Sequence, residues 1–299
     1  MEGKVKDQFG YDNQGKNYDI YRPKYPSEFI EAIKEFCDKK EAYLDVASGT
    51  GIMFFELIKE FSKHGVLNDR SAKQLDVARE KLKTFEHSAE IQAIECDGYE
   101  IAEKLSPKGL KFDLVTFAQA FHWFDAEKMI QYLKDEILAP DGVLAISGYA
   151  TQGIDYNYYS EDPEFSQLAQ TRHDEFLDVV VSHFEFDMRI LRSGYATIDF
   201  ESHFEKVERK PMALMKYEMT LEETKKYFGT YSAYNIYVEK NKSQPSFEDP
   251  LEKLMKRIEQ DLLEHSRKTN SAIKEKPIVL KQPFSLVLAK TFRLAKKLI

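Results

Sequence analysis

The alternation of two kinds of segment between residues 27 and 150 constrains the fold of this chain more than any other feature. An amphipathic stretch, a short apolar run and a polar turn follow one another repeatedly. Apolar residues at helical spacing indicate helices, and short apolar runs bounded by turns indicate buried strands. Strands that alternate with helices form parallel sheets covered on both faces. We therefore expect a doubly wound α/β fold, with right-handed crossovers and ligands at the carboxyl ends of the strands.

Five strands are expected in this part of the chain, over residues 43–47, 66–69, 91–95, 114–118 and 143–147. The same periodicity predicts three helices: one over 27–36 with Ser27 as its N-cap, one over 54–61, and one that begins after Ser71.

The pattern changes after Gly148. Residues 151–165 are polar and rich in tyrosine, and a helical stretch over 164–182 precedes a charged segment that ends at Lys210. Further on, the sequence predicts helices over 220–238 and 251–262, a surface loop over 239–250 and a buried strand over 284–292. We expect a single domain over 1–299. Its parts are an N-terminal lid with the first helix over 1–40, a cofactor-binding core over 41–150, an insertion over the site at 151–210, and C-terminal helices with closing strands over 211–299.

The composition is that of a soluble globular protein, because 42% of the 299 residues are hydrophobic and 31% are charged. No apolar run approaches the roughly 20 residues of a membrane-spanning helix, and the first residues resemble neither a signal nor a transit peptide. We expect a cytoplasmic protein without a membrane partner. The 43 basic and 51 acidic residues give a net charge of −8, which disfavours nucleic acid as a partner. An anionic small molecule needs a local cationic pocket.

The two cysteines, Cys37 and Cys96, lie far apart and form no CxxC pair. Their number excludes a cysteine zinc cage and a disulfide scaffold, and we expect both to be reduced and buried. No histidine or acidic cluster has metal-ligand spacing, so no metal is expected, and no Ser/His pair indicates hydrolytic chemistry.

A glycine turn follows the first expected strand, in the sequence LDVASGTG over residues 44–51. Asp45 lies at the end of the strand, and Gly49 and Gly51 permit positive φ and a close approach of the backbone to a ligand. The turn departs from the dinucleotide fingerprint GxGxxG, because Ala47 stands at the first glycine and Ile52 at the last. A plain strand-to-helix turn is the alternative interpretation.

Two further aspartates, Asp69 and Asp97, follow the second and third strands. Asp69 lies 18 residues after Gly51, where an acidic side chain accepts hydrogen bonds from ribose hydroxyls. Either aspartate alone could be a helix cap or a turn residue. Their shared position at strand tips favours one ligand site at one edge of the sheet.

These segments resemble the class I S-adenosylmethionine-dependent methyltransferases. The motifs that carry the resemblance are LDVASGTG, NDRSAKQLDVARE, ECDG and FDLVTFAQAFHWFD, over 44–51, 68–80, 95–98 and 112–125. FAQAFHWFD, YDIYRPKYP over 18–26 and TYSAY over 230–234 resemble the small-molecule branch that contains trans-aconitate methyltransferase. The resemblance implies a Rossmann-like methyltransferase fold with a mostly parallel, seven-stranded sheet, and S-adenosyl-L-methionine as the cofactor.

The resemblance also implies roles for single residues on the cofactor side. Gly49 and Gly51 would pass close to the methionine part, Asp69 would hold the ribose, Asp97 would lie at the adenine, and Gln119 would border the methionine end. Asp45 and Ala47, in the same turn, are further cofactor-binding candidates. Ala47 stands where the family more often has glycine, and Ser147 and Tyr231 stand where the branch often has an aromatic residue and a tryptophan.

On the acceptor side, the resemblance implies methylation of a small carboxylic acid. Methyl transfer is an in-line displacement, so positioning is the main task, and a carboxylate needs no base because it is ionised at pH 7. Arg22 is a candidate carboxylate anchor or a clasp for the N-terminal segment, and His122 a candidate catalytic residue beside the acceptor. Trp123, Tyr231 and Tyr234 are candidate pocket walls. Surface ion pairing for Arg22 and plain packing for the other four stay open.

Two other functions are compatible with the sequence. One is a methyltransferase fold kept as a binding or assembly subunit without turnover, since a fold alone does not prove activity. The other is a nicotinamide-dependent oxidoreductase, which the missing glycines of the turn disfavour.

Overall fold

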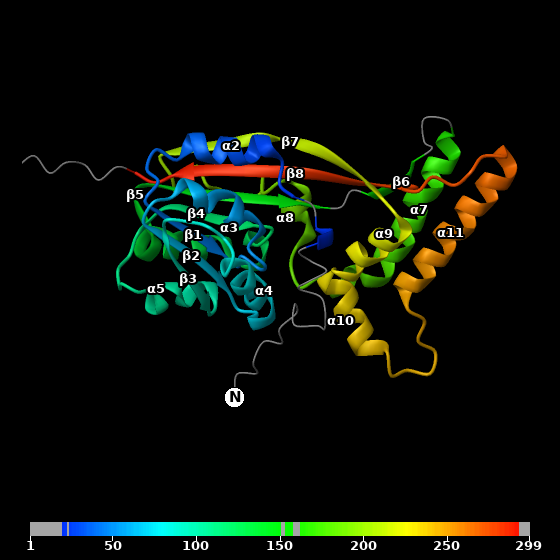
Figure 1. The fold of residues 1–299 in the computed structure, drawn as a ribbon, viewed down its shortest axis with the longest axis horizontal. Coiled ribbons are helices and arrows are strands. Elements are labelled where there is room, and N and C mark those ends of the chain that lie inside the picture. The colour runs from blue at the N-terminus through cyan, green and yellow to red at the C-terminus, as the bar shows by residue number, and fades with distance from the viewer. Residues whose placement is uncertain (1–19, 23, 151–152, 158–161, 293–299) are drawn as a thin grey trace, which may run out of the picture.

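A central sheet of eight strands organises the computed structural model, which describes residues 20–292 except 23, 151–152 and 158–161. Figure 1 shows the sheet extending from a helix-covered core into a second cluster of helices. The strands are β1 Ala42–Val46, β2 His64–Asp69, β3 Glu90–Glu95, β4 Phe112–Ala118, β5 Leu138–Tyr149, β6 Gly153–Tyr156, β7 Lys206–Met219 and β8 Ile278–Lys290.

Strands β1 to β5 pair in parallel in the order β3-β2-β1-β4-β5. The expected doubly wound, mostly parallel sheet is confirmed, because apolar runs bounded by polar turns are strong strand signals. The tips of β1, β2, β3 and β4 lie at one edge of the sheet, and the chain reverses its direction of winding between β1 and β4. A ligand crevice is expected at such a switch point.

The long strand β8 closes the sheet. Its second half pairs antiparallel with β5 and its first half with β6, while β7 pairs with almost all of its other edge. A line across the core therefore crosses seven strands, as the family resemblance implied. The eighth strand, β6, lies beyond the end of β5 and prolongs its row along β8.

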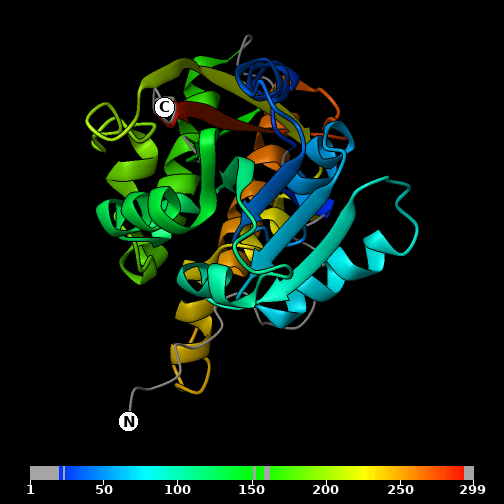
Figure 2. The same ribbon diagram turned by 90° about the vertical axis from the view of Figure 1, so that its left-hand side faces the viewer.

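Ten α-helices lie within the described residues, and they are α2 Ser27–Phe36, α3 Ile52–Leu57, α4 Ala72–Leu82, α5 Ile101–Lys104, α6 Ala126–Tyr132, α7 Pro163–Val180, α8 Met188–Arg192, α9 Leu221–Gly229, α10 Ser232–Asn241 and α11 Pro250–Thr269. Figure 2 shows helical layers on the two faces of the sheet. One face packs against α2, α3 and α4, and the other against α5, α6 and α8, which gives two separate apolar cores.

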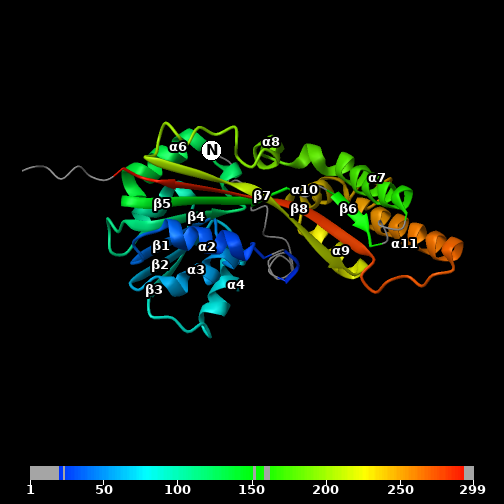
Figure 3. The ribbon, with the colours of Figure 1, turned by 90° about the horizontal axis from the view of Figure 1, so that it is seen from above.

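A third apolar cluster joins β6 and the first half of β8 to α7, α9, α10 and α11. We call these four helices the cap. Figure 3 shows the cap beside the core, with β7 and β8 running from one to the other. Tyr156 is fully buried here, and its hydroxyl donates to Asp261 Oδ2 at 2.7 Å, while Arg172 pairs with the same carboxylate at 2.8 Å.

Several expected boundaries were wrong. Ser27 is the first helical residue of α2 and not its cap, because Pro26 takes that position. The helix expected over 220–238 is interrupted at Thr230 and Tyr231. Strand β7, which begins at Lys206 inside the expected insertion over 151–210, was not predicted. It forms the edge of the sheet, so few of its side chains are buried and its sequence lacks an apolar run.

Candidate functional site

The turn after β1 is held in left-handed conformations. Ala47, Gly49 and Gly51 have φ angles of 50°, 57° and 79°. Gly49 lines a cavity, whereas Gly51 lies at the start of α3, where an added Cβ would come within 2.8 Å of Phe55. Of the two expected glycines, Gly49 is therefore the one that brings backbone to the ligand side, and Gly51 is needed for packing.

Asp69 and Asp97 both line this cavity from the tips of β2 and β3. Asp69 is 8% exposed, and its carboxylate accepts from the backbone N–H of Gly49 and of Ser71, each at 2.8 Å. Asp97 is exposed, and its Oδ1 accepts from the N–H of Tyr99 at 3.0 Å. Carboxylates accept hydrogen bonds from the hydroxyls and amines of a ligand.

Asp45 does not line the cavity, which is a correction to its expected place in the site. It is fully buried in β1, where its Oδ1 accepts from the Thr116 hydroxyl at 2.6 Å. Burial raises the pKa of Asp45 to about 7.

Gln119 lies directly after β4 with a φ angle of 58°, and it lines the cavity as expected. Both ends of its amide are engaged by the backbone of Tyr149, since Nε2 donates to the carbonyl oxygen and Oε1 accepts from the N–H, each at 2.8 Å. Gln119 therefore fixes Tyr149 at the tip of β5.

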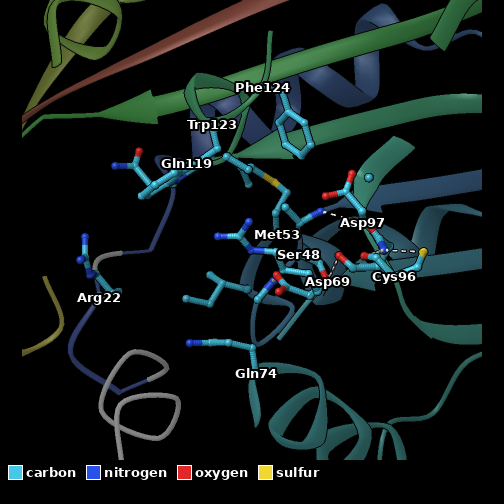
Figure 4. A pocket seen from close by; sticks show the side chains of 18 of the residues that line it. Arg22, Ser48, Met53, Asp69, Gln74, Cys96, Asp97, Gln119, Trp123 and Phe124 are labelled. Carbon is cyan, nitrogen blue, oxygen red and sulfur yellow. Dashed lines mark hydrogen bonds between the residues drawn. The ribbon is translucent and has the colours of Figure 1, made fainter. Parts of the chain in front are cut away.

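The first cavity lies at the carboxyl edge of the sheet. Figure 4 shows Asp69, Asp97 and Cys96 on one side of it, Arg22 opposite, Gln119 and Trp123 above and Gln74 below. Two features fit a polar ligand. The backbone of Gly49 is open to the cavity, and neither polar atom of the buried Gln74 amide has a hydrogen-bond partner in the described part of the chain.

A second, smaller cavity adjoins the first. Four residues line both cavities, and they are Arg22, Gln119, Trp123 and Tyr149. The rest of the second cavity is mostly apolar, with walls from Ala150, Leu177, Phe184, Phe186, Met188, Leu191 and Tyr231, and with His122 and Ser232 as its further polar side chains. A molecule in the second cavity would lie beside one in the first.

Arg22 fastens the segment before α2 to the cap. Its Nε donates to Thr230 Oγ1 at 2.8 Å, one terminal nitrogen to the Thr230 carbonyl at 3.4 Å and the other to the Tyr149 hydroxyl at 3.3 Å. The guanidinium also lies 5.3 Å from the ring centres of Tyr227 and Tyr231. The neighbouring residues 18, 19 and 23 of YDIYRPKYP lie outside the described residues.

His122 lies in the short turn after β4 and lines the second cavity. Its Nδ1 is 3.2 Å from the hydroxyl of the fully buried Tyr195. Burial lowers the pKa of His122 to about 3, so the ring is neutral at physiological pH. Trp123 lines both cavities and packs edge-on against Phe186, with 4.6 Å between the centres of the two rings.

The two cap tyrosines named from the sequence have different positions. Tyr231 lines the second cavity, as expected. Tyr234 lines neither cavity, because its hydroxyl donates to Asp249 Oδ2 at 2.9 Å in the cap. The expectation that Tyr234 forms a pocket wall was therefore wrong.

The comparisons with known proteins agree on one activity. Residues 44–142 match the family model of the methyltransferase domain. A Dictyostelium discoideum protein assigned as a methyltransferase is 26% identical over 237 residues, which are 79% of this chain and 80% of that protein. A probable S-adenosylmethionine-dependent methyltransferase of Saccharomyces cerevisiae is 22% identical over 252 residues, which are 79% of this chain and 84% of that protein. The chain is an S-adenosylmethionine-dependent methyltransferase.

A solved structure supports the class I fold of this methyltransferase. The structure, assigned as a type II methyltransferase from Anaeromyxobacter dehalogenans, has a TM-score of 0.64 at 19% identity and covers 92% of this chain and 100% of its own. The expected fold, enzyme class and cofactor are thus confirmed, and the nicotinamide-dependent alternative is set aside. Membership of the trans-aconitate branch and a cytoplasmic location stay predictions.

Two residues of the methyltransferase site were missed from the sequence. Tyr149 is the last residue of β5, and the reasoning that singled out Asp69 at a strand tip applied equally to it. Gln74 is one polar residue among several in the first turns of α4, and nothing in the sequence distinguishes it. Both expected thiols, Cys37 and Cys96, are buried and free.

Two other features are absent from the described residues of the methyltransferase. No described helix is long and apolar enough to cross a membrane. No three His, Cys, Asp or Glu side chains in the described ranges are grouped so that they could hold a metal ion.

Proposed function

We propose that this methyltransferase methylates a carboxylate oxygen of a small molecule with an apolar body. The observation that carries the proposal is the chemistry of the second cavity, which offers hydrogen-bond donors but no effective base. Its described lining residues include no Asp, Glu, Lys or Cys. His122, with its pKa lowered to about 3, is a poor proton acceptor. A carboxylate needs no base because it is ionised at pH 7.

The hydrogen bond between Tyr195 and His122 supports a positioning role for the imidazole. The Tyr195 hydroxyl is fully buried, and the nitrogen it meets in the described structure is His122 Nδ1. If the hydroxyl donates its proton, Nδ1 is the acceptor and the neutral ring carries its hydrogen on Nε2. His122 then donates to a ligand oxygen in the cavity, which is a positioning role and not that of a general base.

The residues of the first cavity fit S-adenosylmethionine. Asp69 would accept from the ribose hydroxyls, Asp97 would lie at the adenine, and Ala47, Gly49 and Gln119 would border the methionine part. When bound, the cofactor supplies a methyl group on a positively charged sulfur. The protein's own contribution is to hold the acceptor beside that methyl group in a pocket with apolar walls.

The shape and charge of the second cavity support an acid with an apolar body. Phe184, Phe186, Met188, Leu191 and Leu177 form its walls. Arg22 lies where the two cavities meet, so a carboxylate near it is also near the first cavity. The likeness of FAQAFHWFD to the trans-aconitate branch points in the same direction, since that branch methylates carboxylates.

A panel of small acceptors with radiolabelled S-adenosylmethionine tests the proposal. We expect label in base-labile esters of aromatic or branched monocarboxylic acids, and activity without a rising limb above about pH 6. Transfer to amines, thiols or phenols, with a rate that rises through neutral pH, would contradict it. Cofactor binding without transfer to any acceptor would favour a binding or assembly subunit.

A further inference from the structure

The start of helix α10 forms part of the wall of the second cavity. Tyr231 is the N-cap of this ten-residue helix and Ser232 is its first helical residue, and both line the cavity. No side chain in the described structure caps the helix. The N–H groups of a first helical turn have no partner within the helix, and the helix dipole places a partial positive charge there. This end of the cavity therefore favours a group that accepts hydrogen bonds.

A buried hydroxyl without a partner lies at the same place. Ser232 is 6% exposed, and it lines the second cavity but not the first. Its Oγ makes no hydrogen bond to any other described residue, and it is not one of the unpartnered side-chain atoms that are closed off from the surface. Hydroxyls this deeply buried in native proteins are usually hydrogen-bonded. A ligand in the second cavity can supply the missing partner.

The other polar side chains that line the second cavity alone have partners in the protein. The Nδ1 of His122 lies 3.2 Å from the Tyr195 hydroxyl. The Tyr231 hydroxyl donates to the hydroxyl of Tyr227 at 3.4 Å. Within the described lining, Ser232 is therefore the polar side chain whose hydrogen bonds are all left for a ligand.

The charge of the cavity decides which kind of oxygen fits at Ser232. Arg22 is the single cationic side chain of the described lining, and it lies where the two cavities meet, so the reacting carboxylate would take this charge. A second carboxylate at Ser232 would be buried without a cationic partner among the described residues, which is costly. A carbonyl oxygen is neutral and only accepts, which suits a hydroxyl and the N–H groups of a helix start.

We propose that Ser232 and the first turn of α10 bind a second oxygen of the acceptor, so that the preferred acceptor is a monocarboxylic acid with an oxo group on its apolar body. The inference rests on the proposed methylation of a carboxylate. Because Ser232 lines the second cavity alone, the oxo group would lie away from the methyl group while the carboxylate lies at the boundary with the first cavity. Ser232 would thus select among acids by the presence and place of the oxo group.

Two matched pairs of acids test the inference on the full chain with S-adenosylmethionine. Benzoylpropionic acid is paired with phenylbutyric acid, and benzoylbutyric acid with phenylvaleric acid, so that each pair differs by one carbonyl oxygen. In at least one pair, wild type should methylate the oxo acid with a kcat/KM roughly tenfold higher, since hydrogen bonds of this kind contribute about that factor.

Ser232→Ala removes the hydroxyl and suits a helix, because alanine has the highest helix propensity. The ratio of kcat/KM for the oxo acid to that for its partner should fall at least roughly threefold, and the N–H groups of the helix start would account for the preference that is left. Ser27→Ala is the matched control, because Ser27 is the first residue of the ten-residue helix α2 and is exposed. It should keep the wild-type ratio.

Equal kcat/KM for the two members of both pairs in wild type would overturn the inference without the need for any variant. An unchanged ratio in Ser232→Ala, with an unfolding temperature like that of wild type, would also overturn it. If wild type binds S-adenosylhomocysteine but forms no ester from any of the four acids, the proposed methylation of a carboxylate is contradicted instead.

Discussion

At the scale of single residues, the turn after β1 combines two unfavourable features. Ala47 has a left-handed φ angle of 50°, which L-residues other than glycine seldom adopt. Asp45, two residues earlier, is fully buried with one carboxylate oxygen unsatisfied in the described structure. Such costs are common where a backbone is shaped for a ligand. Each of them leads to a prediction.

Replacing Ala47 with glycine should not destabilise the protein. The left-handed conformation costs alanine about 1–2 kcal/mol relative to glycine, which offsets the greater chain entropy that glycine loses on folding. We expect the free energy of unfolding in urea to stay equal or to rise by up to about 1 kcal/mol. Ala32→Gly, within α2, is the control and should lose about 1 kcal/mol. An equal loss at both positions would contradict the strain at Ala47.

The buried carboxyl of Asp45 should make stability depend on pH. Its pKa is about 7 in the folded protein, against about 3.9 in the unfolded chain. The free energy of unfolding is therefore highest below about pH 4, where the carboxyl is protonated in both states. It falls as pH rises from about 4 to about 7, because the unfolded chain loses this proton more readily. Because asparagine does not ionise, the free energy of unfolding of Asp45→Asn should rise relative to wild type by about 2 kcal/mol as pH goes from 5 to 7, measured by urea unfolding. A constant difference across this range, like that of the surface control Asp135→Asn, would disprove the shift.

At the scale of elements, predictability follows burial. Strands β1 to β4 were expected within two residues of their observed bounds, because each contains a short group of apolar residues and is bounded by polar turns. The edge strand β7 was missed since pairing along β8, and not a buried face, defines it. The strand-tip position named Asp69, Asp97 and Gln119, which line the first cavity. It also named Asp45, which shares the strand-end position but faces inward. Tyr234 was named from the TYSAY motif, and nothing in the sequence indicated that its hydroxyl would bond to Asp249 instead.

Arg22 connects elements that are far apart in the sequence, and its planar fork is what makes the connection. Arg22→Lys keeps the charge but loses the paired bonds to Thr230 and Tyr149. We expect kcat/KM for the acceptor to fall at least roughly tenfold, with little change in the unfolding temperature. The exposed Lys24→Arg, two residues away, should leave kcat/KM unchanged. Wild-type kcat/KM in Arg22→Lys would show that the clasp is dispensable.

At the scale of the whole molecule, the two cavities are parts of one site. Arg22, Gln119, Trp123 and Tyr149 form the boundary between them, so a ligand on one side fixes the wall of the other. Two ligands that share ordered side chains bind cooperatively, and the coupling is reciprocal.

Saturation with S-adenosylhomocysteine should therefore tighten acceptor binding roughly fivefold, and the acceptor should tighten S-adenosylhomocysteine binding by the same factor. Calorimetric titrations in both orders measure the two factors. Phe124 lines the first cavity but not the second, so it offers a control. Phe124→Leu should weaken the binding of S-adenosylhomocysteine without changing the coupling factor. Independent binding of the two ligands would contradict the shared wall.

The shared strand β8 limits how the enzyme can open. It runs from the cap into the core, and β7 doubles it along most of its length. Two strands joined by a continuous ladder of hydrogen bonds are stiff, because a sharp bend would break several of these bonds together. We therefore expect that the second cavity does not open by a hinge motion of the cap away from the core. Ligand entry and release should instead require that Arg22 breaks its hydrogen bonds to Thr230. These bonds join the segment before α2 to the junction between α9 and α10.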